Sequence, residues 1–141
     1  MNNAIKHEQL IQLHNFTNLS KWKINIIKCG HDINYILNGL KTYGKQIIGY
    51  GASAKSTTFL HQYKLSNKLI NYIIDDNIYK QNYYSPGLNI QIKQFDILMI
   101  DKPDYIIILS WNFIEEILQK LETFRQSGGR IIIPFPEIKI I

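Results

Sequence analysis

The sequence has little cysteine, no long apolar run and no cluster of one charge. Its single cysteine, Cys29, cannot form an internal disulfide, which favours a reducing compartment. No segment approaches the roughly 20 apolar residues that span a bilayer, and the N-terminal residues lack the apolar stretch of a secretory signal. We therefore expect a soluble, cytoplasmic protein with no membrane partner.

Charge is also sparse. Charged residues make up 19% of the chain, and the formal net charge of +5 comes from scattered lysines. Nucleic-acid readers usually cluster their basic side chains, so we expect no nucleic-acid partner and only some attraction for anionic ligands. Neither a metal site nor a catalytic residue is predicted, because the histidines share no ligand spacing and no Ser/His/Asp signature occurs. The four histidines are His7, His14, His31 and His61.

What the sequence does contain is apolar material for one core, at 45% of 141 residues. Apolar residues from Lys21 to Leu40 recur at helical spacing and predict a helix, or two helices joined at Cys29-Gly30. After Gly44, the segment QIIGYGASAKSTTFLHQY predicts a strand, a tight glycine turn and a helix.

Strands and helices then alternate. LINYIID indicates a buried strand that ends at Asp75 and Asp76, and a long exposed loop around Pro86-Gly87 leads to a short strand at Asn89–Ile92. DYIIILS is the clearest buried strand, NFIEEILQKLETFRQSGG a helix, and RIIIPFP a fifth strand.

This order predicts an α/β fold: a Rossmann-like three-layer sandwich with a mostly parallel sheet and helices on both faces. Right-handed crossovers give the strand order 3-2-1-4-5 for about five strands. Residues 1–37 are interpreted as an N-terminal helical linker, and residues 38–141 as the Rossmann-like domain.

The turn at Gly49-Tyr50-Gly51-Ala52-Ser53-Ala54 satisfies the G-x-G-x-x-G/A pattern between a strand and a helix. In such turns the first glycine permits a sharp bend, the second lets a ligand approach the backbone, and the small third residue allows close packing. Lys55 in the first helical turn suits a phosphate. Alternatively, the glycines only make a compact turn and Lys55 is a solvated charge.

Two further positions fall at carboxyl ends of predicted strands. Asp75 lies 24 residues after Gly51, where such folds hold a ribose hydroxyl, although Asp75 and Asp76 could simply end a strand in water. Trp111-Asn112 follows the strand expected beside the first one, at the switch-point crevice. Ser110 or Asn112 could instead cap the following helix.

Four blocks in this order resemble the C-terminal domain of S-adenosylmethionine-dependent sugar C-methyltransferases. The blocks are GYGASAKSTTFL, IIDDNIYKQNYYSPG, KPDYIIILSWNFIEEI and GGRIIIPFPE, and the likeness covers roughly Asn38 to Glu137. The resemblance implies that a full-length enzyme methylates a carbon of a nucleotide-diphosphate keto-sugar. It also implies that S-adenosylmethionine binds a separate methyl-donor domain or partner chain, and that the present domain helps to hold the sugar nucleotide without catalysing alone.

Pattern and resemblance together predict the nucleotide-sugar-binding residues. These are Gly49, Tyr50, Gly51, Ala52, Ser53, Ala54, Lys55, Asp75, Asn77, Lys80, Trp111 and Asn112. The sequence departs from the family at Asp76, where an arginine is usual, and this reverses the local charge. Two alternatives remain: an NAD(P)-binding domain of an oxidoreductase, and a stand-alone interaction module of a methyltransferase complex.

Overall fold

The computed structural model of the chain describes residues 8, 10, 12 and 15–141. The predicted N-terminal helix is one continuous element, α2 (Phe16–Thr42), which begins where the Asn15 side chain accepts a hydrogen bond from the Thr17 amide at 2.9 Å. Gly30 does not break it. A side chain at Gly30 would overlap the ring of Tyr63, so this glycine allows α2 to pack closely against the segment that follows the next helix.

The sheet has six strands in the order β3-β2-β1-β4-β5-β6. The predicted order 3-2-1-4-5 is confirmed, and the first five strands are parallel. The sixth strand was not predicted: it pairs antiparallel with β5, and its two residues are exposed, so no burial pattern marks it in the sequence. The strands are β1 (Ile47–Tyr50), β2 (Tyr72–Ile74), β3 (Gln91–Lys93), β4 (Tyr105–Ile108), β5 (Arg130–Ile133) and β6 (Lys139–Ile140).

Five shorter helical elements connect the strands. The predicted single helix after β4 is divided into three pieces, with Leu121 between the last two. A short helix before β4 was also not predicted. The elements are α3 (Ala54–Gln62), α4 (Ile97–Asp101), η1 (Trp111–Phe113), α5 (Ile114–Lys120) and α6 (Glu122–Gln126).

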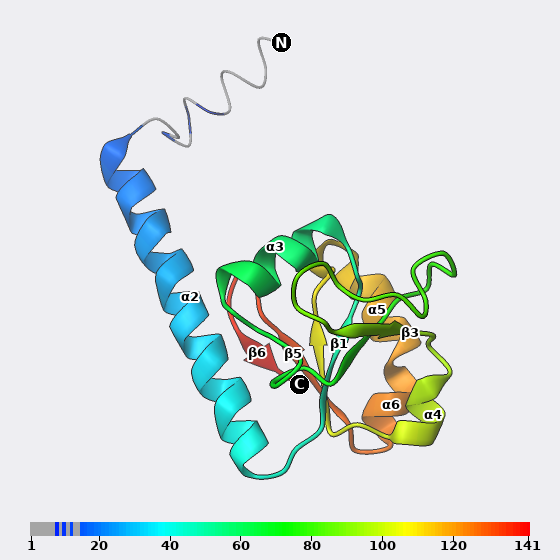
Figure 1. Cartoon of the computed structure of the whole chain (residues 1–141). Helices are drawn as coiled ribbons and strands as arrows, with labels where there is room; N and C mark the ends of the chain where they lie inside the picture. Colours follow the sequence, from blue (N-terminus) through cyan, green and yellow to red (C-terminus); the bar gives the residue numbers. More distant parts are fainter. Residues whose placement is uncertain (1–7, 9, 11, 13–14) are drawn as a thin grey trace.

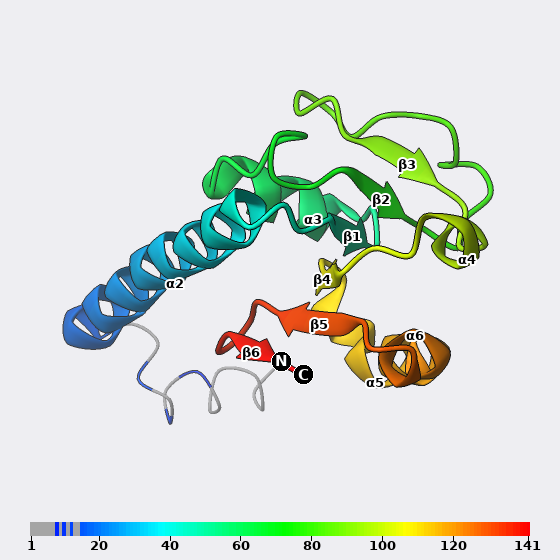
Figure 2. The same cartoon turned by 90° about the horizontal axis from the view of Figure 1, so that it is seen from below.

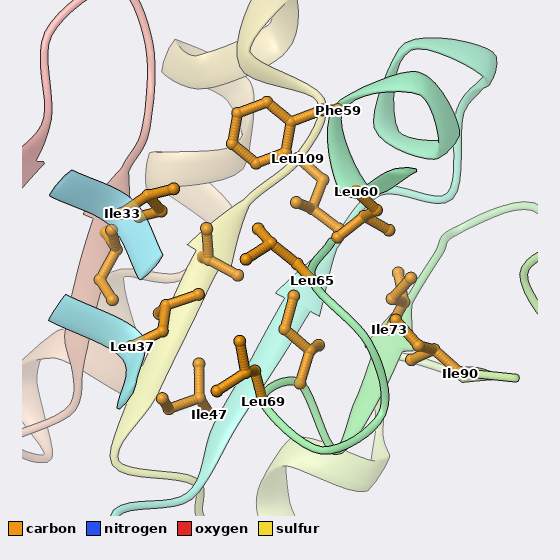
Figure 3. Packing of buried hydrophobic residues seen from close by; sticks show 13 residues of the cluster. Ile33, Leu37, Ile47, Phe59, Leu60, Leu65, Leu69, Ile73, Ile90 and Leu109 are labelled. Atoms are coloured by element: carbon orange, nitrogen blue, oxygen red, sulfur yellow. The ribbon is translucent and has the colours of Figure 1, made fainter. Parts of the chain in front are cut away.

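Helices cover both faces of the sheet, as predicted (Figures 1 and 2). One apolar cluster joins the sheet to α2 and α3, with Ile33, Leu37 and Leu60 fully buried (Figure 3). The other joins it to α4 and α5, through Leu98 and Ile117. The central strands are continuous isoleucine-rich runs, and this composition fits strands that are buried on both faces. No helix in the described part of the chain is long and apolar enough to cross a membrane.

Candidate functional site

The glycine turn lies at the carboxyl end of β1, as the sequence predicted. Its two glycines, however, make room for another part of the chain and not for a ligand. Gly51 has a φ of +96° and makes the sharp bend, and a side chain there would collide with that of Ser110. Gly49 lies within β1, where an added Cβ would come within 2.7 Å of the Leu109 side chain. Both glycines therefore accommodate the chain just after β4, so the close approach to the Gly51 backbone is made by Ser110.

The amides of the turn divide into two groups. Gly51 donates to the Ile74 carbonyl at 2.8 Å, and Ala52 donates to the Asp75 carboxylate at 2.6 Å. The next three amides, those of residues 53–55, have no acceptor within the described residues. They open the nine-residue helix α3, so their N–H groups and the positive end of the helix dipole are available to a ligand.

Ser53 organises this helix start. It is the N-cap of α3, and its hydroxyl accepts a hydrogen bond from the Ser56 amide at 3.2 Å. Ser53 is half-buried, whereas Ala54 and Lys55 are exposed. Lys55 has no ion pair in the described structure, so its ammonium group is available at the rim of the turn.

Asp75 is buried, at 8% exposure, and does not end its strand in water. Its carboxylate accepts hydrogen bonds from the amides of Ala52 and Asn77 and lies 3.3 Å from the Lys80 ammonium. The carboxylate thus ties the glycine turn to the loop after β2. Asn77 in turn accepts from the Tyr79 amide at 3.0 Å, which makes it a local turn residue.

The sequence interpretation missed a polar group beside the turn. Asp76 accepts hydrogen bonds from the Tyr50 hydroxyl, at 3.0 and 3.1 Å, and from Lys120 at 2.6 Å. Burial, followed by the nearby Asp76 and Asp75 carboxylates, raises the pKa of Tyr50 well above its ordinary value. Tyr50 is therefore a neutral donor. Asp76 was detectable as a charge at a strand end, but nothing in the sequence pairs it with Lys120 of α5, 44 residues away.

These residues line a cleft of about 210 Å³. Five of the predicted residues contribute to it: Tyr50, Gly51, Ser53, Asp75 and Lys80. The wall includes three carboxylates and two lysines, and each lysine is paired with a carboxylate. The cleft is thus suited to hydroxyl groups, which can both donate and accept, rather than to a bare anion. Six lining residues were not among the predicted binding residues: Asp76, Ser110, Phe113, Glu116, Ile117 and Lys120.

Trp111 and Asn112 are at the expected strand end but do not line this cleft. Trp111 is half-buried and packs its ring against Phe59 and Phe135, with centroid separations of 5.5 and 5.7 Å. Asn112 is exposed within η1. The expected capping is not observed, because no side chain makes a capping hydrogen bond at the starts of η1 and α5.

A larger groove of about 720 Å³ lies apart from the turn, between α2 and the C-terminal segment. Cys29 lines it and donates a hydrogen bond to the Pro134 carbonyl at 3.3 Å. Partial burial raises the pKa of the Cys29 thiol, which makes it a poor nucleophile. Within the described residues, no three His, Cys, Asp or Glu side chains are grouped so that they could hold a metal ion.

Comparison with known proteins agrees with the four sequence blocks. Residues 1–136 match the family described as the C-methyltransferase C-terminal domain, a match that includes α2. A similar curated protein is the C-methyltransferase NovU of Streptomyces niveus, with 33% identity over 109 residues. The aligned region is 77% of the present chain and 26% of NovU, so the chain spans about a quarter of this relative. The family match covers nearly the whole chain, which therefore belongs to the C-methyltransferase C-terminal domain family.

Proposed function

We propose that this domain binds the nucleotide-diphosphate sugar for an S-adenosylmethionine-dependent C-methyltransferase, and that it does not catalyse methyl transfer alone. Membership of the C-methyltransferase family supports the reaction class. The observation on which the proposal depends is the group of three amides at the start of α3 that have no acceptor in the described part of the chain, next to a cleft that offers hydroxyl partners.

The two parts of the ligand have different partners in this proposal. The diphosphate lies at residues 53–55, where amides, the helix dipole and the Lys55 ammonium all favour negative charge. A hydroxylated ring lies in the cleft, where Asp76 accepts and Tyr50 donates hydrogen bonds. The phosphates stay outside the cleft, because its carboxylates would repel them.

Asp75 favours this proposal over an NAD(P)-binding oxidoreductase domain. In a dinucleotide site the acidic residue after the second strand accepts hydrogen bonds from ribose hydroxyls. Here that carboxylate is buried and already bonded to two amides and Lys80, so a ribose would have to displace one of them.

The test is a titration of the isolated chain with dTDP-glucose, GDP-mannose and CDP-glucose, followed by amide chemical shifts. We expect the largest shifts at residues 53–55. Lys55→Glu is expected to weaken binding about threefold to tenfold, because it reverses the charge nearest the diphosphate. The matched control is Lys68→Glu. The amide of Asn71, three residues later, donates a hydrogen bond to the Ile47 carbonyl at the start of β1. Lys68 is therefore near the amino edge of the sheet, opposite the glycine turn.

Two outcomes contradict the proposal. One is the lack of any shift at residues 53–55 with all three sugar nucleotides at millimolar concentration. The other is tighter binding of NADH than of every sugar nucleotide in the same titration.

A further inference from the structure

An aromatic pair, defined as Trp111 and Phe135, lies at the carboxyl edge of the sheet and does not line the cleft. Trp111 follows β4 and Phe135 follows β5, and these strands are parallel neighbours, so both residues leave the same edge. Their ring centroids are 5.7 Å apart. Phe135 is 42% exposed and Trp111 is half-buried. Part of the aromatic surface of the pair is therefore open to a ligand.

The aromatic pair is fixed in place from the side of α3. The Trp111 ring packs edge-on against Phe59 of α3, at a centroid separation of 5.5 Å, and Phe59 packs in the same way against Tyr63 at 4.8 Å. Figure 3 shows the buried Phe59 ring beside the chain that leaves β4. Because the rings are already ordered by these contacts, a ligand that stacks on the pair loses little binding energy in ordering it.

The candidate anion site has the cleft on one side and the aromatic pair on the other. The anion site consists of the amides of residues 53–55, which have no acceptor in the described part of the chain. The cleft is on the α5 side, where Glu116 and Lys120 line it, whereas Trp111 is turned toward Phe59 of α3. Two strand positions separate β1, which leads into α3, from β5, or about 10 Å at the usual strand spacing.

We propose that the aromatic pair stacks the nucleobase of the sugar nucleotide. This inference rests on the proposed function, which places the diphosphate at residues 53–55 and the sugar in the cleft. The nucleoside and the sugar are attached to opposite ends of the diphosphate, so the base extends to the side away from the cleft. Every base has a π-face, and stacking on an aromatic ring therefore adds affinity without choosing among bases.

Another group of exposed aromatic residues lies on the wrong side of the diphosphate. Tyr79, Tyr83 and Tyr84 are each more than half exposed in the loop after β2. The same loop contributes Lys80 to the wall of the cleft, so these tyrosines belong to the side that the sugar occupies. The aromatic pair is thus the better stacking surface for the base.

The first test follows the two tryptophan indole N–H signals of the chain, Trp22 and Trp111, which are assigned with Trp22→Phe. We expect dTDP to shift the Trp111 signal. Pyrophosphate, which has no base, should leave that signal in place while it still shifts the amides of residues 53–55. Trp22 is the internal control, because it precedes the part of α2 that is buried against the sheet.

The second test varies the exposed ring. Phe135→Leu keeps an apolar side chain but removes the π-face, and we expect it to weaken dTDP binding at least about fivefold. Phe135→Tyr keeps an aromatic ring and should bind dTDP as the natural chain does. Unchanged pyrophosphate binding shows that both variants are folded. The matched control is Tyr43→Leu, which changes a ring that is 83% exposed just before β1, at the opposite edge of the sheet.

Three results overturn the inference and leave the proposed function intact, provided that residues 53–55 still shift. They are equal dTDP affinities of Phe135→Leu and Phe135→Tyr, a Trp111 signal that dTDP does not move, and base-dependent shifts at residues 79–84 in its place. A different result, the lack of any shift at residues 53–55 with pyrophosphate, dTDP and every sugar nucleotide, contradicts the proposed function and this inference together.

Discussion

At the scale of single residues, the two glycines of the turn serve packing within the protein. A glycine-rich turn is commonly explained by a ligand that approaches the backbone. In this chain the space beside Gly51 belongs to Ser110, and the space beside Gly49 belongs to Leu109. The amides that remain available to a ligand are the three that follow, at residues 53–55.

Gly51→Ala is therefore expected to destabilise the protein by more than about 2 kcal/mol. A positive φ costs a residue with a Cβ about 1–2 kcal/mol, and the collision with Ser110 adds to that. Gly39→Ala is the control, because a Cβ at Gly39 would meet no atom within 4 Å from more distant parts of the described chain, and alanine favours a helix interior. Chemical denaturation measures both. Equal stability of the two variants would show that the turn does not need Gly51.

The two neighbouring aspartates give a second contrast. Asp75→Ala removes a buried carboxylate and leaves the half-buried Ala52 amide without its acceptor, and we expect a loss of about 1–3 kcal/mol. Asp76→Ala removes a largely exposed pair with Lys120, and we expect a loss of about 0–1 kcal/mol. Urea denaturation of both variants at neutral pH checks the ranking. A greater loss at Asp76 would mean that the polar group with Tyr50 stabilises the fold more than the Asp75 bonds do.

At the scale of elements, Asp104 links the amino ends of neighbouring strands. Its carboxylate lies 2.8 Å from Lys45 and accepts from the Gln46 amide just before β1, while its carbonyl accepts from Arg130 at the start of β5. The Lys45 ammonium and then the Gln46 amide hold the pKa of Asp104 below its ordinary value of 3.8.

This pKa direction predicts a pH-dependent effect of Asp104→Asn. A lowered pKa in the folded state means that the ionised carboxylate stabilises the protein above its unfolded-state pKa, and that this stability is lost as pH falls through the folded value. The variant should melt at a slightly lower temperature than the natural chain at pH 7, and the gap should close in acid, below the folded-state pKa of Asp104. A gap that is independent of pH would assign the effect to packing.

At the scale of the whole molecule, α2 belongs to the core only through its C-terminal half. The sequence interpretation placed a boundary between residues 37 and 38, yet Ile33 and Leu37 are fully buried against the sheet and α3. The N-terminal half of the same helix extends away from this core (Figures 1 and 2).

Two shortened chains test this division. A chain that begins at Asn25 keeps every fully buried residue of α2 and should fold with nearly unchanged stability. A chain that begins at Asn38 loses Ile33 and Leu37, and each loss of a buried aliphatic side chain costs about 2–5 kcal/mol. That sum is comparable with a typical domain stability of about 5–15 kcal/mol, so this chain should be largely unfolded. Circular dichroism with thermal melting distinguishes them, and cooperative melting of the shorter chain would place the boundary after Leu37.

The sequence by itself determined the strand order and the position of the turn. Runs of isoleucine mark strands buried on both faces, glycines mark the bend, and right-handed crossovers leave one order for the parallel strands. These features are local or follow from general handedness, so a linear pattern contains them. The two exposed residues of β6 and the breaks in the helix after β4 have no such pattern.

Only the tertiary structure decided how the side chains at the carboxyl edge are used. Asp75 binds Ala52 across 23 residues, and Lys120 reaches Asp76 across 44. It also decided that, of the apolar residues of α2, Leu37 is fully buried and Trp22 is 46% exposed. The physical reason is the same in each case: a hydrogen bond or a buried face depends on which distant element packs alongside, and residue type and spacing within one segment do not specify that neighbour.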